Sequence, residues 1–180
     1  MPADAAPPAY DADAPGLYVA NVLRLVDGRD PLALLEDGPG RVADAVVDLS
    51  DADARRPPRP GAWSVLAVLR HLADSEVVYG YRLRLIVASD RPAIPGYDQD
   101  AWADRLHYHR GTVADALDEW RAGRAGTLRF LRSLGEDEWE RVGVHSERGE
   151  ESVHHVAALL AGHDLNHERQ VRRVREALSV

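Results

Sequence analysis

The chain has 180 residues, the length of one domain, and 45% of them are hydrophobic, enough for one buried core. Its formal net charge of −8 disfavours a nucleic-acid partner held by a basic surface. The absence of cysteine excludes a disulfide scaffold, a thiolate zinc site and a cysteine nucleophile. We find neither a secretory signal nor an apolar run of the ~18 residues that span a bilayer, so we expect a cytoplasmic protein with no membrane partner.

Apolar residues recur with the 3.6-residue spacing of helices along most of the chain, and strand-like alternation is scarce. This pattern predicts an all-α fold. Residues 1–16 are mostly Ala, Asp and Pro and are predicted to form a flexible tail before a single domain over residues 17–180. Helices are predicted over residues 17–26, 31–36, 38–49, 64–88, 113–134 and 152–178.

The predicted boundaries follow from capping and helix-breaking residues. Asp37 is predicted to cap the helix that begins at residue 38, and Ser64 and Ser152 are predicted to cap two of the long helices. The prolines within residues 55–61 indicate an extended connector, and residues 142–149 an irregular turn or a short hairpin. Four substantial helices with short additional ones are typical of a helical bundle.

The last helix carries the clearest chemical signal. Its apolar residues fall within a narrow arc, and His163 and His167 lie in the middle of that arc, one turn apart. Two adjacent buried imidazoles are costly unless their polar atoms are satisfied, and a divalent metal would satisfy both. The alternative is a pair of core histidines bonded to carbonyl groups. Asp164 follows His163 where metalloproteases of the H-E-x-x-H type have glutamate, which disfavours that class.

A third metal ligand would have to come from another helix. His71 is the best candidate, because it lies two turns into the helix 64–88 at the flank of its apolar arc, where a side chain reaches a neighbouring helix. The alternative is a histidine at the solvent edge. The remaining histidines are expected to be solvated: His107, His109, His145, His154 and His155.

Several charged residues are candidates for supporting roles. Glu76, Asp164 and Glu168 could orient a ligand imidazole, or could be surface charges and interhelical ion pairs. Arg124 falls inside the apolar arc of the helix 113–134 and could hold a substrate carboxylate or phosphate, or could pair with a carboxylate of the bundle. Asp98 could bind substrate near the metal, or could stabilise a turn.

Four segments, in this order and at these separations, carry a family resemblance. They are Trp63-Ser64, then His71-Leu72-Ala73-Asp74-Ser75-Glu76, then Pro95-Gly96-Tyr97-Asp98-Gln99-Asp100-Ala101-Trp102, and finally Gly162-His163-Asp164-Leu165-Asn166-His167. With them the chain resembles the DinB/YfiT-like family over about residues 32–178.

The resemblance implies a four-helix bundle of up-down-down-up topology, often dimeric. It also implies a divalent metal ion, such as zinc or nickel, held by His71, His163 and His167. Relatives resemble thiol S-transferases or isomerases that use a low-molecular-weight thiol, and others are described as metal-dependent hydrolases. From the residues and the resemblance together we expect thiol transfer to a small electrophile, with metal-dependent hydrolysis as the alternative and a non-catalytic metal- or ligand-binding bundle in stress as the competing class. The expected partners are a small substrate and a second copy of the chain.

Overall fold

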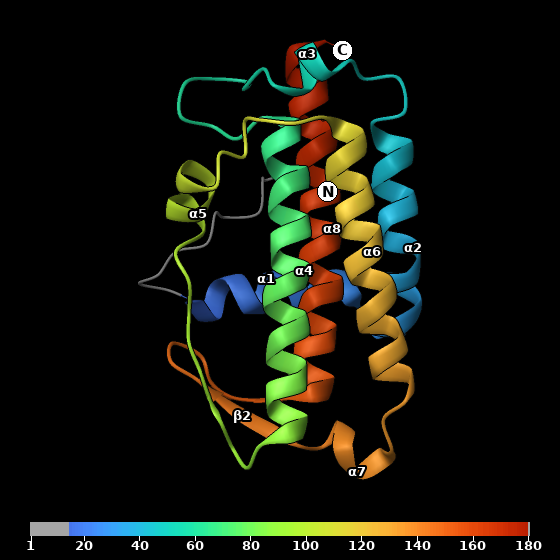
Figure 1. Ribbon diagram of the computed structural model, residues 1–180, viewed down its shortest axis with the longest axis vertical. Helices are drawn as coiled ribbons and strands as arrows, with labels where there is room; N and C mark the ends of the chain where they lie inside the picture. The colour runs from blue at the N-terminus through green and yellow to red at the C-terminus, as the bar shows by residue number, and fades with distance from the viewer. Residues whose placement is uncertain (1–14, 180) are drawn as a thin grey trace, which may run out of the picture.

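Four long helices run side by side in the computed structural model, which describes residues 15–179 (Figure 1). They are α2 (Pro31–Ala45), α4 (Val65–Ala88), α6 (Val113–Arg132) and α8 (Val153–Leu178). Followed by colour in Figure 1, α2 and α8 run towards the end that carries the C-terminus, and α4 and α6 run the opposite way. The predicted all-α bundle of up-down-down-up topology is confirmed. The predicted tail falls almost entirely on residues 1–14, outside the described residues.

Shorter elements close the ends and sides of the bundle. The short helices are α1 (Pro15–Val26), α3 (Asp51–Ala54), α5 (Gln99–Arg105) and α7 (Glu136–Trp139), and the strands are β1 (Ala93–Ile94), β2 (Val142–His145) and β3 (Gly149–Ser152). Strands β2 and β3 form the short hairpin that the sequence allowed as an alternative to an irregular turn. Strand β1 pairs with β2 in parallel. Among residues 15–179, none of the helices combines the length and the apolar character needed to cross a membrane.

A polar layer divides the core of the bundle into two apolar clusters. The first cluster includes Leu83 and Leu160, and the second includes Leu69 and Val171. Between them, α4, α6 and α8 contribute buried polar side chains, which we call the polar layer: His71, Ser75, Glu76, Arg124, His163, Asp164 and His167. Since burying so many polar groups together is costly without partners, the layer marks the part of the bundle with a function beyond packing.

The predicted break between two helices at Asp37 is wrong, because α2 continues through Gly38 and Pro39. A proline inside a helix has no N–H to donate to the carbonyl four residues earlier, here that of Leu35. Arg124 Nη1 donates to this Leu35 oxygen at 2.8 Å and so replaces the missing bond. Helix α2 therefore continues because a side chain from α6 satisfies the carbonyl that Pro39 leaves without a donor.

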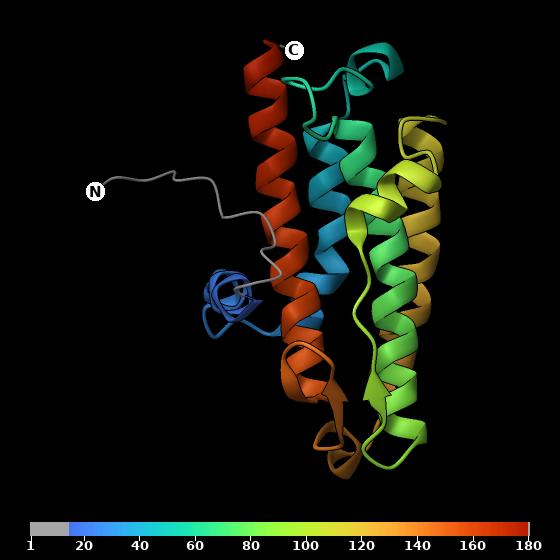
Figure 2. The ribbon, with the colours of Figure 1, turned by 90° about the vertical axis from the view of Figure 1, so that its left-hand side faces the viewer.

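Helix α1 crosses the bundle almost at right angles and lies against α8, where Figure 2 shows it end-on. The crossing point is Gly162, which directly precedes His163 in α8. A Cβ atom at this position would collide with the backbone carbonyl of Val22 in α1. The close approach therefore requires glycine, and it brings Tyr18 of α1 to the recess described below.

We expect Gly162→Ala to lower the free energy of unfolding by roughly 1–3 kcal/mol, because the backbone of α1 must move to admit the methyl group. Urea unfolding followed by circular dichroism measures the effect. Gly40→Ala is the matched control, since a Cβ there meets nothing within 4 Å. This change in the exposed part of α2 should stabilise the chain by about 0.5–1 kcal/mol. Equal stability of Gly162→Ala and the unchanged chain would rule out the tight crossing.

Candidate metal centre

Three histidines converge in the polar layer. His71 of α4 and His163 and His167 of α8 each offer a ring nitrogen, and these nitrogens all lie within 4.8 Å of one another. The Nε2 atoms of His71 and His163 are 3.0 Å apart. All three side chains are buried, so the solvent-edge alternative for His71 does not hold. The structure thus brings together the three residues that the sequence singled out as candidate ligands.

Burial keeps the three imidazoles neutral. It lowers the pKa of His71 and of His163 well below the ordinary value for histidine, with a further contribution from the neighbouring rings. It also lowers the pKa of His167 to about 4, although the hydrogen bond with Gln170 opposes the shift. Neutral imidazole is the form whose nitrogen lone pair binds a metal, so all three are ready to act as ligands without first losing a proton.

Neighbours on the same helices orient two of the rings. His167 Nδ1 lies 2.7 Å from Gln170 Oε1, an acceptor, so Nδ1 carries the proton and Nε2 is the free donor atom for a metal. Ser75 Oγ lies 3.3 Å from His71 Nε2 and 3.2 Å from the hydroxyl of Tyr97. Helical spacing explains both contacts, since Gln170 follows His167 by three residues and Ser75 follows His71 by four.

These observations fit a divalent cation. The donor set consists of imidazoles, which suit zinc, copper, iron and nickel. The Nε2 atoms of His71 and His163 face each other in a buried space, where one cation can accept the lone pairs of both. Core histidines bonded to carbonyl groups would instead turn these nitrogens towards backbone oxygens, so a shared cation explains the cluster better.

Arg124 does not offer its guanidinium to a substrate carboxylate or phosphate, which corrects the first role that the sequence suggested for it. Its guanidinium is buried, with Nε donating to Glu76 Oε2 at 2.8 Å and Nη1 donating to Asp164 Oδ2 at 2.7 Å. Burial opposes its charge, but Asp164 and Glu76 outweigh that effect and raise the pKa of Arg124. The alternative reading, a structural pair with carboxylates of the bundle, is the one that the structure shows.

The three carboxylates that could have oriented the imidazoles pair with arginines instead. Glu76 and Asp164 pair with Arg124, and burial raises the pKa of Asp164 to about 6 despite that pairing. Glu168 pairs with Arg41 at 3.0 Å and with Arg172 at 3.0 Å on the side of α8. Within residues 15–179, none of these ion pairs and hydrogen bonds involves a histidine ring. Gln170 and Ser75 orient the imidazoles instead, a role for which the sequence did not single them out.

Asp98 stabilises a turn and has no contact with the histidines. Its Oδ1 accepts hydrogen bonds from the backbone N–H groups of Asp100 and Ala101, at 3.0 and 2.9 Å, and so caps helix α5. Asp98 therefore stabilises a turn, which is the second of the two roles that the sequence suggested. These hydrogen bonds give no support to the first role, binding of substrate near the metal.

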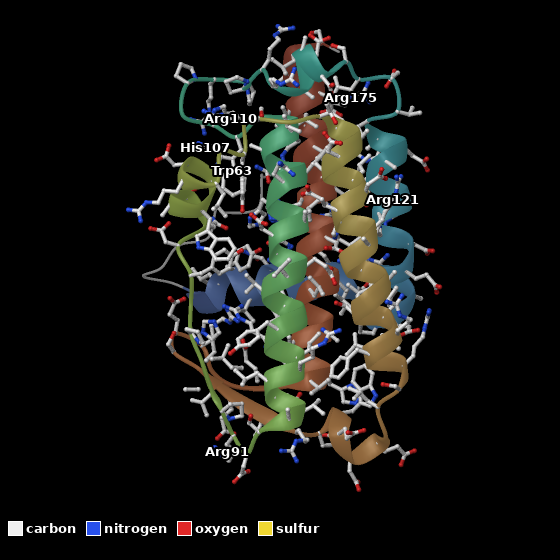
Figure 3. The ribbon with its side chains drawn as sticks, viewed as in Figure 1. Trp63, Arg91, His107, Arg110, Arg121 and Arg175 are labelled. Atoms are coloured by element: carbon white, nitrogen blue, oxygen red, sulfur yellow. The ribbon has the colours of Figure 1, made fainter. Side chains whose placement is uncertain are left out.

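A small recess with a volume of about 50 Å³ lies beside the three histidines and shares His163 with them. Its remaining walls come from α1, α4, the start of α5 with the segment before it, and the hairpin, and the lining residues are Tyr18, Tyr79, Arg82, Gly96, Tyr97, Gln99, His145, Glu147 and Arg148. The expectation that His145 is solvated is wrong, because its side chain is 98% buried at the end of β2. By contrast, His107 lies beyond the end of α5 and is exposed (Figure 3).

Comparison with known proteins places the chain in a family. The sequence model of the DinB superfamily matches residues 34–171. A protein of Oceanobacillus iheyensis named "Putative metal-dependent hydrolase" is 30% identical over 133 residues, which cover 74% of this chain and 77% of the relative. A protein of the same description from Bacillus subtilis, YfiT, is 28% identical over 119 residues, or 66% of this chain and 67% of the relative.

The fold has a counterpart among solved structures. YfiT from Bacillus subtilis, described as "a probable metal-dependent hydrolase with an unusual four-helix bundle topology", superposes with a TM-score of 0.77 and 23% sequence identity. The superposition covers 83% of this chain and 86% of that structure. Because the family model spans most of the bundle, including all three histidines, the chain belongs to the DinB superfamily.

Proposed function

We propose that this protein is a metal-dependent hydrolase whose cation is held by His71, His163 and His167. The observation that carries the proposal is the convergence of three buried imidazoles beside a recess that shares His163 with them. Zinc and nickel are the proposed metals, since both accept imidazole ligands. The descriptions of the relatives from Oceanobacillus iheyensis and Bacillus subtilis support the same class of reaction.

A cation bound by three neutral imidazoles would keep its full charge and an open position, so it would lower the pKa of a bound water towards ~7 and polarise a carbonyl group. The chain supplies a hydrogen-bond donor next to this position. Burial raises the pKa of Tyr97 to about 12, so its hydroxyl keeps its proton at neutral pH. Ser75 Oγ lies between this hydroxyl and His71 Nε2, the atom that faces His163 Nε2. Tyr97, which lines the recess, can therefore donate a hydrogen bond to a substrate group there.

Thiol transfer to a small electrophile is the second candidate. The same three imidazoles would serve it, because a metal-bound thiol loses its proton as readily as a metal-bound water. The chain has no cysteine, so the thiol would have to be a low-molecular-weight co-substrate. A recess beside the ligands favours either reaction over a non-catalytic metal-binding bundle. The homodimer, the cytoplasmic location and a role in stress remain parts of the proposal that analytical ultracentrifugation and cell fractionation can address.

One experiment separates these functions. The full chain is loaded with zinc or nickel and offered activated esters and amides without thiol, and then an aryl halide together with a small thiol such as N-acetylcysteine. Metal-dependent ester or amide hydrolysis supports the hydrolase. Conjugation of the thiol with no hydrolysis supports the transferase and overturns the hydrolase. Metal binding with neither activity supports the non-catalytic class.

Gln170→Leu should weaken metal binding by roughly 10- to 100-fold, because the acceptor that fixes the His167 tautomer is lost. Competition with a chromogenic zinc chelator measures the dissociation constant. Gln170→Glu keeps an acceptor at the same place and should retain tight binding. If Gln170→Leu binds zinc as tightly as the unchanged chain, Gln170 does not orient the ligand.

A further inference from the structure

The recess beside His163 has walls that are rich in hydrogen-bond donors. Two arginines, three tyrosines and two histidines line it, and among the described residues Glu147 is its one lining carboxylate. Glu147 lies at the exposed side, where its carboxylate packs against Gly96. Burial raises the pKa of Tyr18 and of Tyr79, so these phenols keep their protons and can donate. The inner part of the recess therefore offers donors to a ligand and few acceptors.

His145 presents a donor with no partner. The backbone N–H of Glu147 donates to His145 Nδ1 at 3.2 Å, so Nδ1 has no proton and the neutral ring carries its proton on Nε2. Burial, together with the positive charges of Arg148 and Arg82, lowers the pKa of His145 to about 4, which keeps this neutral form. Its Nε2 has no hydrogen-bond partner among residues 15–179. A buried donor of this kind costs about 1–3 kcal/mol unless a ligand accepts from it.

Arg82 presents a buried positive charge that, among the described residues, has no ion-pair partner, although the carboxylate of Glu151 acts on it from a greater distance. Only 3% of the residue is exposed, Nη2 donates to the neutral carbonyl of Pro95 at 2.8 Å, and the guanidinium lies over the rings of Tyr79 and Tyr97. Within the described part of the chain, no carboxylate lies within ion-pair distance of it.

The other two buried or half-buried arginines of this region differ from Arg82 in this respect. Arg124 is paired with two carboxylates, and Arg148 donates to both oxygens of Glu151, at 2.5 and 3.0 Å. Because burying an unpaired charge is expensive, Arg82 is best explained by an anion that arrives with a ligand.

We propose that the recess binds a compact oxyanion group of the substrate, a carboxylate or a phosphate, through the guanidinium of Arg82 and the Nε2–H of His145. The inference deepens the proposed function, on which it rests for the reaction, by naming the substrate class. Arginine offers the planar pair of donors that such groups accept, and neutral imidazole adds a directional donor. Since His163 belongs both to the recess and to the histidine cluster, an anionic group held there places the rest of a small substrate next to the metal.

The test is a titration of the metal-free full chain, so that binding of the oxyanion to a metal does not contribute. Acetate, inorganic phosphate and uncharged acetamide are added while the ring resonances of the histidines are followed by NMR. We expect saturable binding of an oxyanion and none of acetamide. Tighter binding of acetate identifies a carboxylate site, and tighter binding of phosphate identifies a phosphate site.

Variants locate the binding. Arg82→Gln and His145→Phe should each weaken oxyanion binding at least tenfold, and His145→Phe keeps a ring of similar size if Arg82→Gln fails to fold. Arg84→Gln, on the exposed side of α4, and His154→Phe, on the exposed side of α8, are the matched controls and should bind normally. Failure of both oxyanions to bind, or binding that survives Arg82→Gln and His145→Phe, would overturn the proposal.

Ester hydrolysis is measured in a separate assay on the zinc-loaded chain. We expect Arg82→Gln to raise KM for mono(4-nitrophenyl) glutarate at least tenfold and to leave KM for neutral 4-nitrophenyl acetate unchanged. If the unchanged chain hydrolyses both esters with equal KM values, the oxyanion site is overturned and the proposed hydrolase function stands. Oxyanion binding that depends on Arg82 in a chain with no hydrolytic activity would support the site and overturn the proposed reaction.

Discussion

His163→Ala should abolish both metal binding and metal-dependent hydrolysis. His163 contacts both of the other rings, since its Nε2 lies 3.0 Å from that of His71 and its ring is 4.3 Å from that of His167, centroid to centroid. Its loss removes a ligand and opens the site towards the recess. The effect on affinity should exceed the roughly 10- to 100-fold typical of a residue that only orients a ligand. Elemental analysis after dialysis, combined with the ester assay, measures both results.

His154→Ala is the matched control for this change. His154 lies on the same helix, its side chain is 61% exposed, and its Nε2 is 3.5 Å from a carboxylate oxygen of Glu140. The variant should bind metal and hydrolyse esters as the unchanged chain does. A thermal melt adds a second readout, because a ligand present at 1,000 times its dissociation constant stabilises by about 4 kcal/mol. Zinc should raise the melting temperature of His154→Ala and should not raise that of His163→Ala.

Arg124→Met should destabilise the chain by roughly 3–5 kcal/mol, because it leaves the carboxylates of Glu76 and Asp164 buried without their cation. The same change removes the donor to the Leu35 carbonyl that Pro39 leaves unsatisfied. Urea unfolding at neutral pH measures the loss. Metal affinity should fall as well, since Asp164 follows a ligand in the sequence and loses its fixed position.

Arg121→Met is the control on the same helix. Arg121 is exposed on the outside of α6 (Figure 3), and its one ion pair among the described residues is with Asp118 at 3.2 Å, so its loss should change stability by no more than about 0.5 kcal/mol. The triple variant Arg124→Met, Glu76→Gln and Asp164→Asn removes the charges together. It should recover part of the lost stability, because a buried network contributes non-additively. If Arg124→Met is as stable as Arg121→Met, the buried network does not hold α2, α4, α6 and α8 together.

The long helices and the histidines were predictable because their signals are local. Ser64 and Ser152 precede periodic apolar runs, and both cap helices in the structure through bonds to Ala67 N and His155 N. The spacing of His163 and His167 fixes them on one face of a helix whatever surrounds it. His71 meets the other two histidines because α4 packs against α8. Its position at the flank of the apolar arc of its helix indicated such a contact with a neighbouring helix.

The supporting residues were not predictable in the same way because their partners are distant in sequence. Arg124 is 48 residues from Glu76 and 89 from Leu35, so its role depends on the packing of three helices. The continuation of α2 through Pro39 depends on that same arginine, which the capping signal of Asp37 could not reveal. His145 lies between β1 and β3, which pair with β2 on its two sides, and this placement depends on strands far apart in the sequence. Gln170 and Ser75, in contrast, lie three and four residues after a ligand, and a search at those spacings would have found them.

The most direct measurement is a crystal structure of the zinc-loaded chain with anomalous diffraction data collected on both sides of the zinc absorption edge. We expect a single strong anomalous peak at about 2.0–2.1 Å from one ring nitrogen each of His71, His163 and His167. An empty cluster in fully zinc-treated crystals, or a peak held by other residues, would contradict it.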